Sequence, residues 1–215
     1  MHDWDLSLHL SNACCIHSPR RPLLKRRAYF LVISSVWLLA SCASHPFANF
    51  EGETLIQPLP LPEQDWQLFQ REIDEPNMIE TRWTQDATQD ITQTFVMPQA
   101  GGKTADVMQS KNNDDHLGKA SCNVSFTSKV LSDENENGYR QLTWQSECEM
   151  QAGLYIKTLH KSIVGNESMY LFKRIFRTVP KPKQWQQWVD YANSIHVCDT
   201  RLSASPCPED LPIGK

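Results

Sequence analysis

The sequence lacks the short motifs that identify the best-understood catalytic and cofactor sites. It contains no GxSxG, HExxH, Walker A or GxGxxG string, the motifs of serine hydrolases, zinc proteases, nucleotide-binding proteins and dinucleotide-binding proteins. It also has no CxxC pair, the spacing typical of structural zinc sites. No metal site or cofactor is therefore expected, and an enzymatic function is the less favoured one.

Positive charge and long hydrophobic runs are also scarce. The chain carries 21 Lys and Arg against 25 Asp and Glu, a net charge of −4, whereas a nucleic-acid-binding domain is usually strongly basic. The main apolar stretch, 13 residues from Ala28 to Ala40, is too short to cross a hydrocarbon core of ~30 Å as a helix. With 40% hydrophobic and 21% charged residues, the composition indicates a soluble globular protein and excludes collagen-like and multi-spanning classes.

The first 41 residues have the layout of a secretory signal. A basic cluster at residues 20–27 precedes the apolar stretch, and small residues follow it. Residues 1–19 are long for the segment that precedes a signal, and we hypothesise that translation starts downstream of them. Detection of a precursor peptide that contains Trp4 by mass spectrometry would contradict this hypothesis.

The signal ends in Leu39-Ala40-Ser41-Cys42, which resembles the lipobox of bacterial lipoproteins. The resemblance implies cleavage before Cys42, diacylation of its thiol and acylation of the new amino terminus, with palmitate as an expected acyl group. Neither Ala43 nor Ser44 is the aspartate that retains such proteins in the inner membrane, so the resemblance implies an outer-membrane lipoprotein that faces the periplasm. The alternative is a plain secretory signal that ends near a cysteine.

Without the signal, residues 42–215 form a mature chain of 174 residues with a net charge of −7. Prolines at positions 46, 58, 60 and 62 and the lack of periodicity indicate a lipidated flexible tether over residues 42–63. Residues 64–215 are long enough for a single domain.

Four cysteines of the mature chain remain for disulfides: Cys122, Cys148, Cys198 and Cys207. An oxidising compartment favours their pairing. The runs CNVSFTSKVL and YRQLTWQSEC flank a cluster of turn-forming residues, and a hairpin symmetric about Asn135 places Cys122 opposite Cys148, with one apolar and one polar face. Cys198 then pairs with Cys207. Four free, separately buried thiols are the alternative.

The patterning predicts an α+β fold, an antiparallel β-sheet with a C-terminal amphipathic helix packed on it, stapled by the disulfides. Further strands are expected at residues 66–73, 78–84, 91–97, 154–164 and 168–178, the last two joined by a turn at Gly165-Asn166. The first of these runs could also be a helix, because WQLF fits one helical turn. A short helix is expected over residues 105–111 after Thr104, and the polar run 112–116 is interpreted as a solvated loop rather than a calcium site. The C-terminal helix begins near Pro182 and carries an apolar stripe to Val197.

Candidate functional residues are few. Four histidines are scattered over the mature chain, and any of them could act as a base if a carboxylate and a nucleophile met it in space: His45, His116, His160 and His196. One basic stretch stands out: Lys173, Arg174, Arg177, Lys181 and Lys183. It could bind anionic lipid headgroups, lipopolysaccharide phosphates or an acidic partner. The interpretation that we favour is a charged sheet edge that discourages aggregation.

The sequence therefore favours a membrane-anchored envelope lipoprotein, a non-enzymatic binding or accessory component of the periplasm or outer membrane. Its expected partners are membrane lipid, through Cys42, and an envelope protein. One alternative is a periplasmic hydrolase whose catalytic site is assembled only in three dimensions, and another is a scaffold that binds peptidoglycan or another envelope protein. A pocket in which a histidine lies beside a serine or a carboxylate would favour the hydrolase, and a flat sheet face with exposed aromatics would favour a partner surface.

Overall fold

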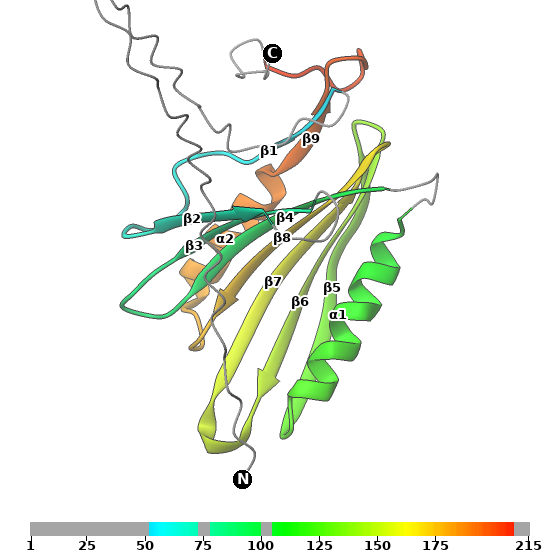
Figure 1. Ribbon diagram of the computed structural model, residues 1–215. Coiled ribbons are helices and arrows are strands. Elements are labelled where there is room, and N and C mark those ends of the chain that lie inside the picture. The colour runs from blue at the N-terminus through cyan, green and yellow to red at the C-terminus, as the bar shows by residue number, and fades with distance from the viewer. Residues whose placement is uncertain (1–51, 73–77, 100–104, 209–215) are drawn as a thin grey trace, which may run out of the picture. The chain divides into compact units, whose positions relative to one another are not determined.

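The computed structural model describes residues 52–72, 78–99 and 105–208 (Figure 1). The predicted signal, the predicted lipidation site Cys42, the first part of the predicted tether and the predicted helix cap Thr104 lie outside these residues. The predicted fold class is confirmed: an antiparallel sheet with two helices packed on it and two disulfides. Among the residues described, no helix is long and apolar enough to cross a membrane.

Seven antiparallel strands form the main sheet, in the order β2-β3-β4-β8-β7-β6-β5 (Figure 1). Their bounds are β2 (Gln67–Glu72), β3 (Ile79–Thr84), β4 (Ile91–Pro98), β5 (Ser125–Glu136), β6 (Tyr139–Glu149), β7 (Tyr155–Val164) and β8 (Ser168–Phe176). The five strands predicted outside the cysteine hairpin are confirmed to within two residues at each end. However, β8 lies between β4 and β7, so the interpretation of its basic residues as a charged sheet edge is wrong.

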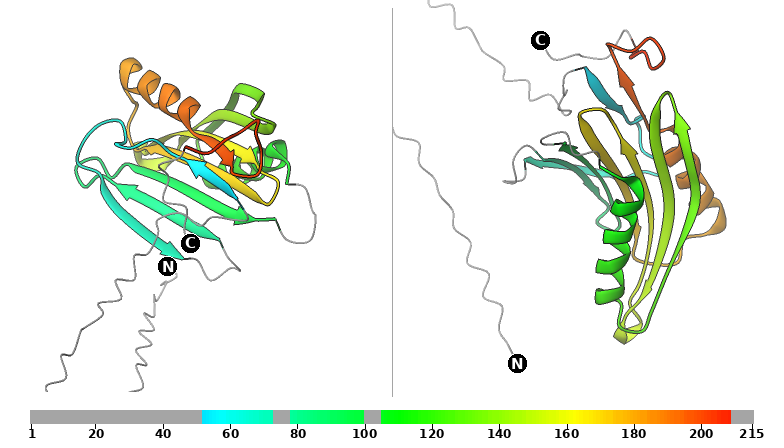
Figure 2. Two further views of the ribbon diagram at one scale, coloured as in Figure 1. Left: turned by 90° about the horizontal axis from the view of Figure 1, so that it is seen from above. Right: turned by 90° about the vertical axis from the view of Figure 1, so that its right-hand side faces the viewer.

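The two helices cover opposite faces of this sheet (Figure 2). α2 (Pro182–Ser194) buries Trp188, Tyr191 and Ala192 and packs its aromatic rings on Phe172 of β8. Lys161 of β7 fastens the end of α2, because its ammonium donates to two backbone carbonyl oxygens there at 2.9 and 2.6 Å. α1 (Val107–Ser121) contacts β5, β6 and β7 on the other face. The prediction had a single helical layer, and the structure has two.

α1 is longer than predicted. Asp106 caps it by accepting a hydrogen bond from the Met108 backbone at 2.9 Å, and the helix continues to Ser121. The interpretation of residues 112–116 as a loop is therefore wrong. Asn and Asp are weak helix formers, but propensity yields to side-chain contacts, and here Lys111 pairs with Asp115 one turn later at 2.5 Å.

The Cys122–Cys148 disulfide is confirmed, with its Cα atoms 5.4 Å apart, but the predicted register is wrong. Phe126, not Cys122, lies opposite Cys148, and the turn falls at Asn137-Gly138 instead of Asn135. Both turn residues have positive φ, 54° and 86°, which is the geometry of a two-residue hairpin turn and suits an Asn-Gly pair. Cys122 instead ends α1, so the disulfide joins this helix to β6.

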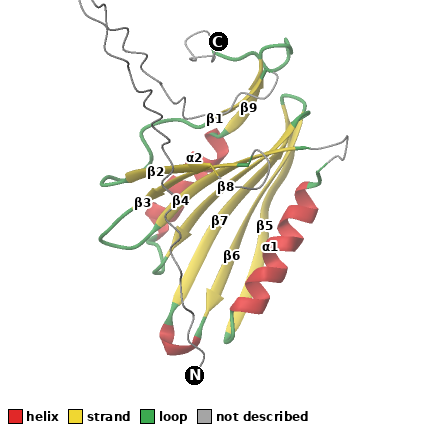
Figure 3. Ribbon diagram, viewed as in Figure 1, coloured by secondary structure: helices red, strands yellow, loops and turns green. Residues whose placement is uncertain are grey.

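A second sheet consists of β1 (Glu53–Ile56) and β9 (His196–Asp199), which lie at the top of Figure 3. The tether prediction is therefore wrong for residues 53–62, and Leu55 and Leu61 belong to the hydrophobic core. β9 also replaces the predicted end of the C-terminal helix. The buried Glu53 carboxylate accepts hydrogen bonds from the backbone of the β7–β8 turn, and the Cys198–Cys207 disulfide is confirmed just beyond β9.

Candidate functional site

A groove with a volume of about 300 Å³ lies between α1 and the sheet face that this helix partly covers. One part of its wall is apolar and includes the Cys122–Cys148 disulfide together with Leu117, Phe126, Ile156 and Ile175. The other part is polar and contains Gln93, Asp114, Ser146, His160 and Lys173. The volume is at the lower end of the range of ~300–1,000 Å³ that is typical of ligand pockets.

Strand alternation and helix periodicity bring the groove residues together. Ser146 pairs with Thr158 and His160 pairs with Trp144 across β6 and β7, so Ser146 and His160 lie on the same face as diagonal neighbours. On α1, Asp114 shares the groove with residues three and four positions further on. Gly118 lets the helix approach the sheet, because a Cβ at this position would collide with the Phe126 ring.

Ser146, His160 and Asp114 form a chain of polar contacts in this groove. The Nε2 atom of His160 lies 2.9 Å from the Ser146 Oγ, and its Nδ1 atom lies 3.3 Å from an Asp114 carboxylate oxygen. The imidazole ring stacks on Trp144, with ring centroids 4.6 Å apart and planes 5° from parallel. A neutral imidazole with its proton on Nδ1 accepts a hydrogen bond from the Ser146 hydroxyl. Its Nδ1 faces Asp114 in an electrostatic contact that lacks the geometry of a hydrogen bond.

Burial and charge set the protonation of these groups. Burial lowers the pKa of His160 below its ordinary value, and the neighbouring Asp114 carboxylate offsets this effect only in part. The histidine is therefore neutral at neutral pH. Burial acts to raise the pKa of Asp114, but its contacts with His160 and Lys173 prevail and lower it. Asp114 is thus a carboxylate, and the Lys173 ammonium lies 2.9 Å from it.

The free energy of unfolding is expected to decrease as the pH falls below about 6.5. In the unfolded chain His160 takes up a proton near its ordinary pKa of ~6.5, whereas in the folded protein the lowered pKa opposes protonation, so acid favours unfolding. The slope is at most about 1.4 kcal/mol per pH unit for one proton. Urea unfolding between pH 8 and pH 5 measures it. His160→Gln should flatten the slope, and the exposed control His116→Gln should leave it unchanged; equal slopes in both variants would contradict the assignment.

A serine, a histidine and a carboxylate in this order also form the relay of many acyl-transfer enzymes. Such enzymes need in addition hydrogen-bond donors that are aimed at the oxyanion of the transition state. Ser146 lies in the interior strand β6, which is paired with β5 and β7, so its backbone N–H points along the sheet into the ladder, away from the side chain. Within the described part of the chain, the N–H donors on the polar wall are the side chains of Gln93, His160 and Lys173. The groove can therefore bind a polar group but offers no preorganised backbone oxyanion hole there.

The structure does not bring the five predicted cations together. Lys173 and Arg174 are adjacent in β8 and point to opposite faces: Lys173 lies in the groove beside Asp114, and Arg174 is buried on the α2 side. Arg177, Lys181 and Lys183 are exposed around the start of α2. No single anion-binding surface results from these five residues.

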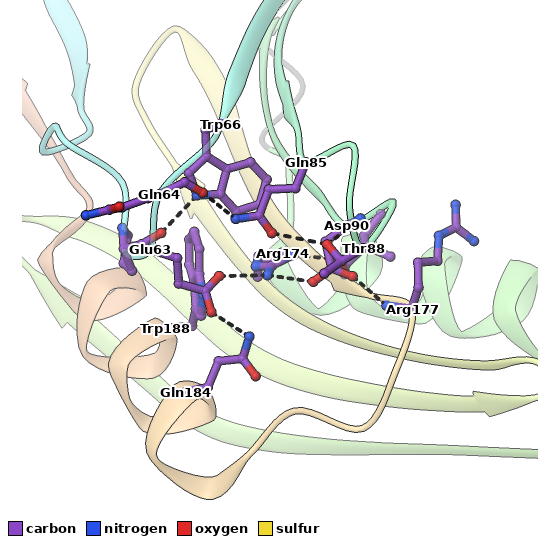
Figure 4. Close-up of polar contacts among 12 residues, drawn as sticks. Glu63, Gln64, Trp66, Gln85, Thr88, Asp90, Arg174, Arg177, Gln184 and Trp188 are labelled. Atoms are coloured by element: carbon purple, nitrogen blue, oxygen red, sulfur yellow. Dashed lines mark hydrogen bonds and ion pairs between the residues drawn. The ribbon is translucent and has the colours of Figure 1, made fainter.

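Arg174 is instead the centre of a buried network (Figure 4). Its side chain is 0% exposed, and its guanidinium lies 2.9 Å from Asp90 and 3.1 Å from Glu63. Three aromatic rings surround the guanidinium, those of Trp66, Phe176 and Trp188, at 4.0–4.8 Å from their centroids. The network joins the segment before β2, the β3–β4 turn and α2 to the middle of the sheet. Burial lowers the pKa of Arg174, and the attraction of the two carboxylates opposes this lowering. Because the guanidinium is enclosed by two carboxylates and three aromatic rings, its role is structural.

Sequence reasoning named His160 as a candidate but missed its two partners. Ser146 could have been placed beside His160 only with the register between β6 and β7. Asp114 was assigned to a loop, where no helical spacing would aim it at the sheet. The signal that was present is the alternation of Trp144, Ser146 and Cys148 on one face of a predicted strand.

No protein-family model and no curated protein matches the chain. The solved structures that match parts of the chain include two with weak similarity. One is PA94 from Pseudomonas aeruginosa, a protein of unknown function, with 10% identity, coverage of 66% of this chain and 95% of that chain, and a TM-score of 0.36. The other is LpqN, involved in cell envelope biogenesis of Mycobacterium tuberculosis, with 14% identity, coverage of 72% and 86%, and a TM-score of 0.36. At this level neither similarity carries an argument about function.

Proposed function

We propose that this chain is an envelope lipoprotein, anchored through an acylated Cys42, and that its domain is an accessory component that binds a ligand without transforming it. The observation that carries the binding role is the groove beneath α1, with its apolar wall and its polar wall. The anchor rests on the lipobox resemblance of residues 39–42. The binding site and the anchor belong to one chain, which suits a protein that presents or holds a ligand at the membrane.

The Ser146–His160–Asp114 contacts favour a second candidate, an acyl hydrolase, and three observations make it the weaker one. The backbone donors next to Ser146 are committed to the sheet. His160 is only 6% exposed and is held between Trp144 and α1, which leaves little room for the ring to reorient. Asp114 is already neutralised by Lys173, which weakens its support for a histidine that becomes charged during catalysis.

A fluorophosphonate probe, which modifies activated serine hydroxyls, distinguishes the two candidates. We expect no adduct at Ser146 under conditions that label a known serine hydrolase to completion, because no oxyanion hole assists the attack. Intact-mass spectrometry of the wild-type protein, Ser146→Ala and His160→Gln provides the measurement. Stoichiometric labelling that disappears in both variants would refute the binding role and establish the hydrolase.

The anchor is tested by replacement of Cys42. In a bacterial host fed with labelled palmitate, the wild-type chain is expected to carry the label and to sediment with the membranes. Cys42→Ser is expected to lose both properties, since no other residue of the chain is proposed to be acylated. The Cys198→Ser/Cys207→Ser variant is the control for general effects of cysteine loss. A label that persists in Cys42→Ser would contradict the proposed anchor.

A further inference from the structure

We propose that the ligand of the groove is a neutral acyl compound, a chain of about eight carbon atoms joined through an ester or amide to an uncharged polar head. This inference rests on the proposed binding role and adds the chemical class of the ligand. It follows from the size of the groove, from the apolar wall and from the charge balance of the polar wall.

The size of the groove limits the apolar part of the ligand. A volume of about 300 Å³ holds about ten groups of the size of a water molecule, each ~30 Å³, and a methylene group is of similar size. Because this volume lies between both walls, the ten groups include the ester or amide as well as the chain. Aliphatic and aromatic side chains line this space, and Leu117 is 63% exposed although it forms part of the wall. An exposed leucine on a wall that faces Ile156 and Ile175 is the contact that an apolar chain would cover.

The charge balance of the polar wall selects the head. Lys173 is compensated by Asp114 at 2.9 Å, and His160 is neutral, so these three groups carry no net charge. An anionic head would lie beside Asp114, and a cationic head would lie beside Lys173. Either head would lose its hydration on binding and would find no unpaired opposite charge in return.

The hydrogen-bonding groups of the polar wall match an ester or an amide. Gln93 lines the groove and its side-chain amide makes no hydrogen bond within the described residues, so it can donate to a ligand carbonyl. The Ser146 Oγ lies 2.9 Å from the His160 Nε2. With the imidazole protonated on Nδ1, the hydroxyl donates to Nε2 and keeps lone pairs that can accept from a hydroxyl or N–H of the head. A ligand with a carbonyl and a hydrogen-bond donor next to each other at the end of an acyl chain would therefore fit Gln93 and Ser146.

Calorimetric titration tests the ligand class directly. The mature chain with Cys42→Ser, exported through a cleavable signal and purified without detergent, is titrated with monoacyl glycerols of 6 to 12 carbons. Each added methylene should tighten binding about fourfold until chain and ester together fill the groove, at about eight carbons, and have no effect beyond that. Decanoate and decyltrimethylammonium should bind at least tenfold more weakly than monodecanoyl glycerol.

Two variants locate the binding in the groove. Ile175→Trp fills the space beside the apolar wall and should abolish binding, whereas Val179→Trp places the same ring at a site that is 70% exposed outside the groove and should bind normally. Leu117→Asp, at a wall position that is 63% exposed, should weaken binding at least tenfold.

Equal binding of the charged amphiphiles, an affinity independent of chain length, or normal binding by Ile175→Trp and Leu117→Asp would each overturn the proposed ligand class. Such a result together with an unlabelled Ser146 leaves the binding role in place. A labelled Ser146 refutes the binding role itself, so the two failures are distinguishable.

Discussion

Replacement of Arg174 by methionine is expected to lower the free energy of unfolding by about 3–5 kcal/mol. The side chain is fully buried, and its guanidinium faces the carboxylates of Asp90 and Glu63 at 2.9 and 3.1 Å. A methionine fills much of the same volume but leaves two carboxylates without their cation, one of them only 4% exposed. Removal of one partner of a buried ion pair is far more destabilising than replacement of the whole pair, because the remaining charge stays desolvated.

Urea unfolding of matched variants measures this effect. Arg177→Met removes a neighbouring cation whose side chain is exposed, and it should change stability by less than about 0.5 kcal/mol. Arg174→Lys keeps the charge but loses the planar fork that reaches both carboxylates and stacks on the rings, so an intermediate loss is expected. The combination of Arg174→Met with Asp90→Asn and Glu63→Gln should recover part of the stability. A loss in Arg174→Met no larger than in Arg177→Met would contradict the structural role.

In the sequence, Arg174 belongs to one basic stretch with four other cations, whereas in the structure it is buried apart from them. Phe172, Arg174 and Phe176 alternate along β8 and therefore share a face, which was a local sign that the arginine is buried. Its two carboxylates could not be found locally, because Asp90 and Glu63 are 84 and 111 residues away in the chain. A strand pattern tells which face a residue occupies, and only the tertiary fold tells what meets it there.

The same distinction explains which parts of the fold were predictable. Strands such as β4 and β8 follow from short-range alternation and flanking turn residues, and their bounds were predicted closely. β1 has only four residues and pairs with β9 at the other end of the chain, so its proline-rich surroundings dominated the prediction. The continuation of α1 through Asn112 and Asp115 depends on contacts with the sheet and with its own next turn, which local propensity does not contain.

The hairpin register shows two local signals in competition. The assumption that Cys122 faces its disulfide partner across the hairpin fixed the turn at Asn135, whereas the Asn137-Gly138 pair is the stronger turn signal. In the structure the hairpin turns at Asn137-Gly138, and Cys122 forms its disulfide from the end of α1. The hairpin register also affects the candidate site, because the Cys122–Cys148 disulfide helps to position α1 over Ser146 and His160.

Removal of the Cys122–Cys148 disulfide is the second change with a large expected effect, about 3.5 kcal/mol by loop-closure entropy. The Cys198–Cys207 disulfide closes a shorter loop, with a sequence separation of 9 instead of 26, and should contribute about 2.7 kcal/mol. The two disulfides are expected to differ more in their effect on the local stability of α1 than in their contribution to the free energy of unfolding. α1 buries Val107 and Lys111, and Val107 packs with Leu142 and Trp144 of β6. The helix is therefore held by apolar contacts at its start, by Asp114 in the middle and by the disulfide at its end.

Amide hydrogen exchange of Cys122→Ser/Cys148→Ser, compared with Cys198→Ser/Cys207→Ser, separates local from global loosening. In the first variant the amides of α1 should exchange much faster than those of α2, because the helix loses its covalent attachment while the opposite face keeps its aromatic core. In the second variant α1 should stay protected. Since α1 forms one side of the groove, the first variant should also bind the groove ligand more weakly. Unchanged protection of α1 without its disulfide would mean that the remaining contacts of the helix, such as those of Asp114 and Gly118, suffice to hold it on the sheet.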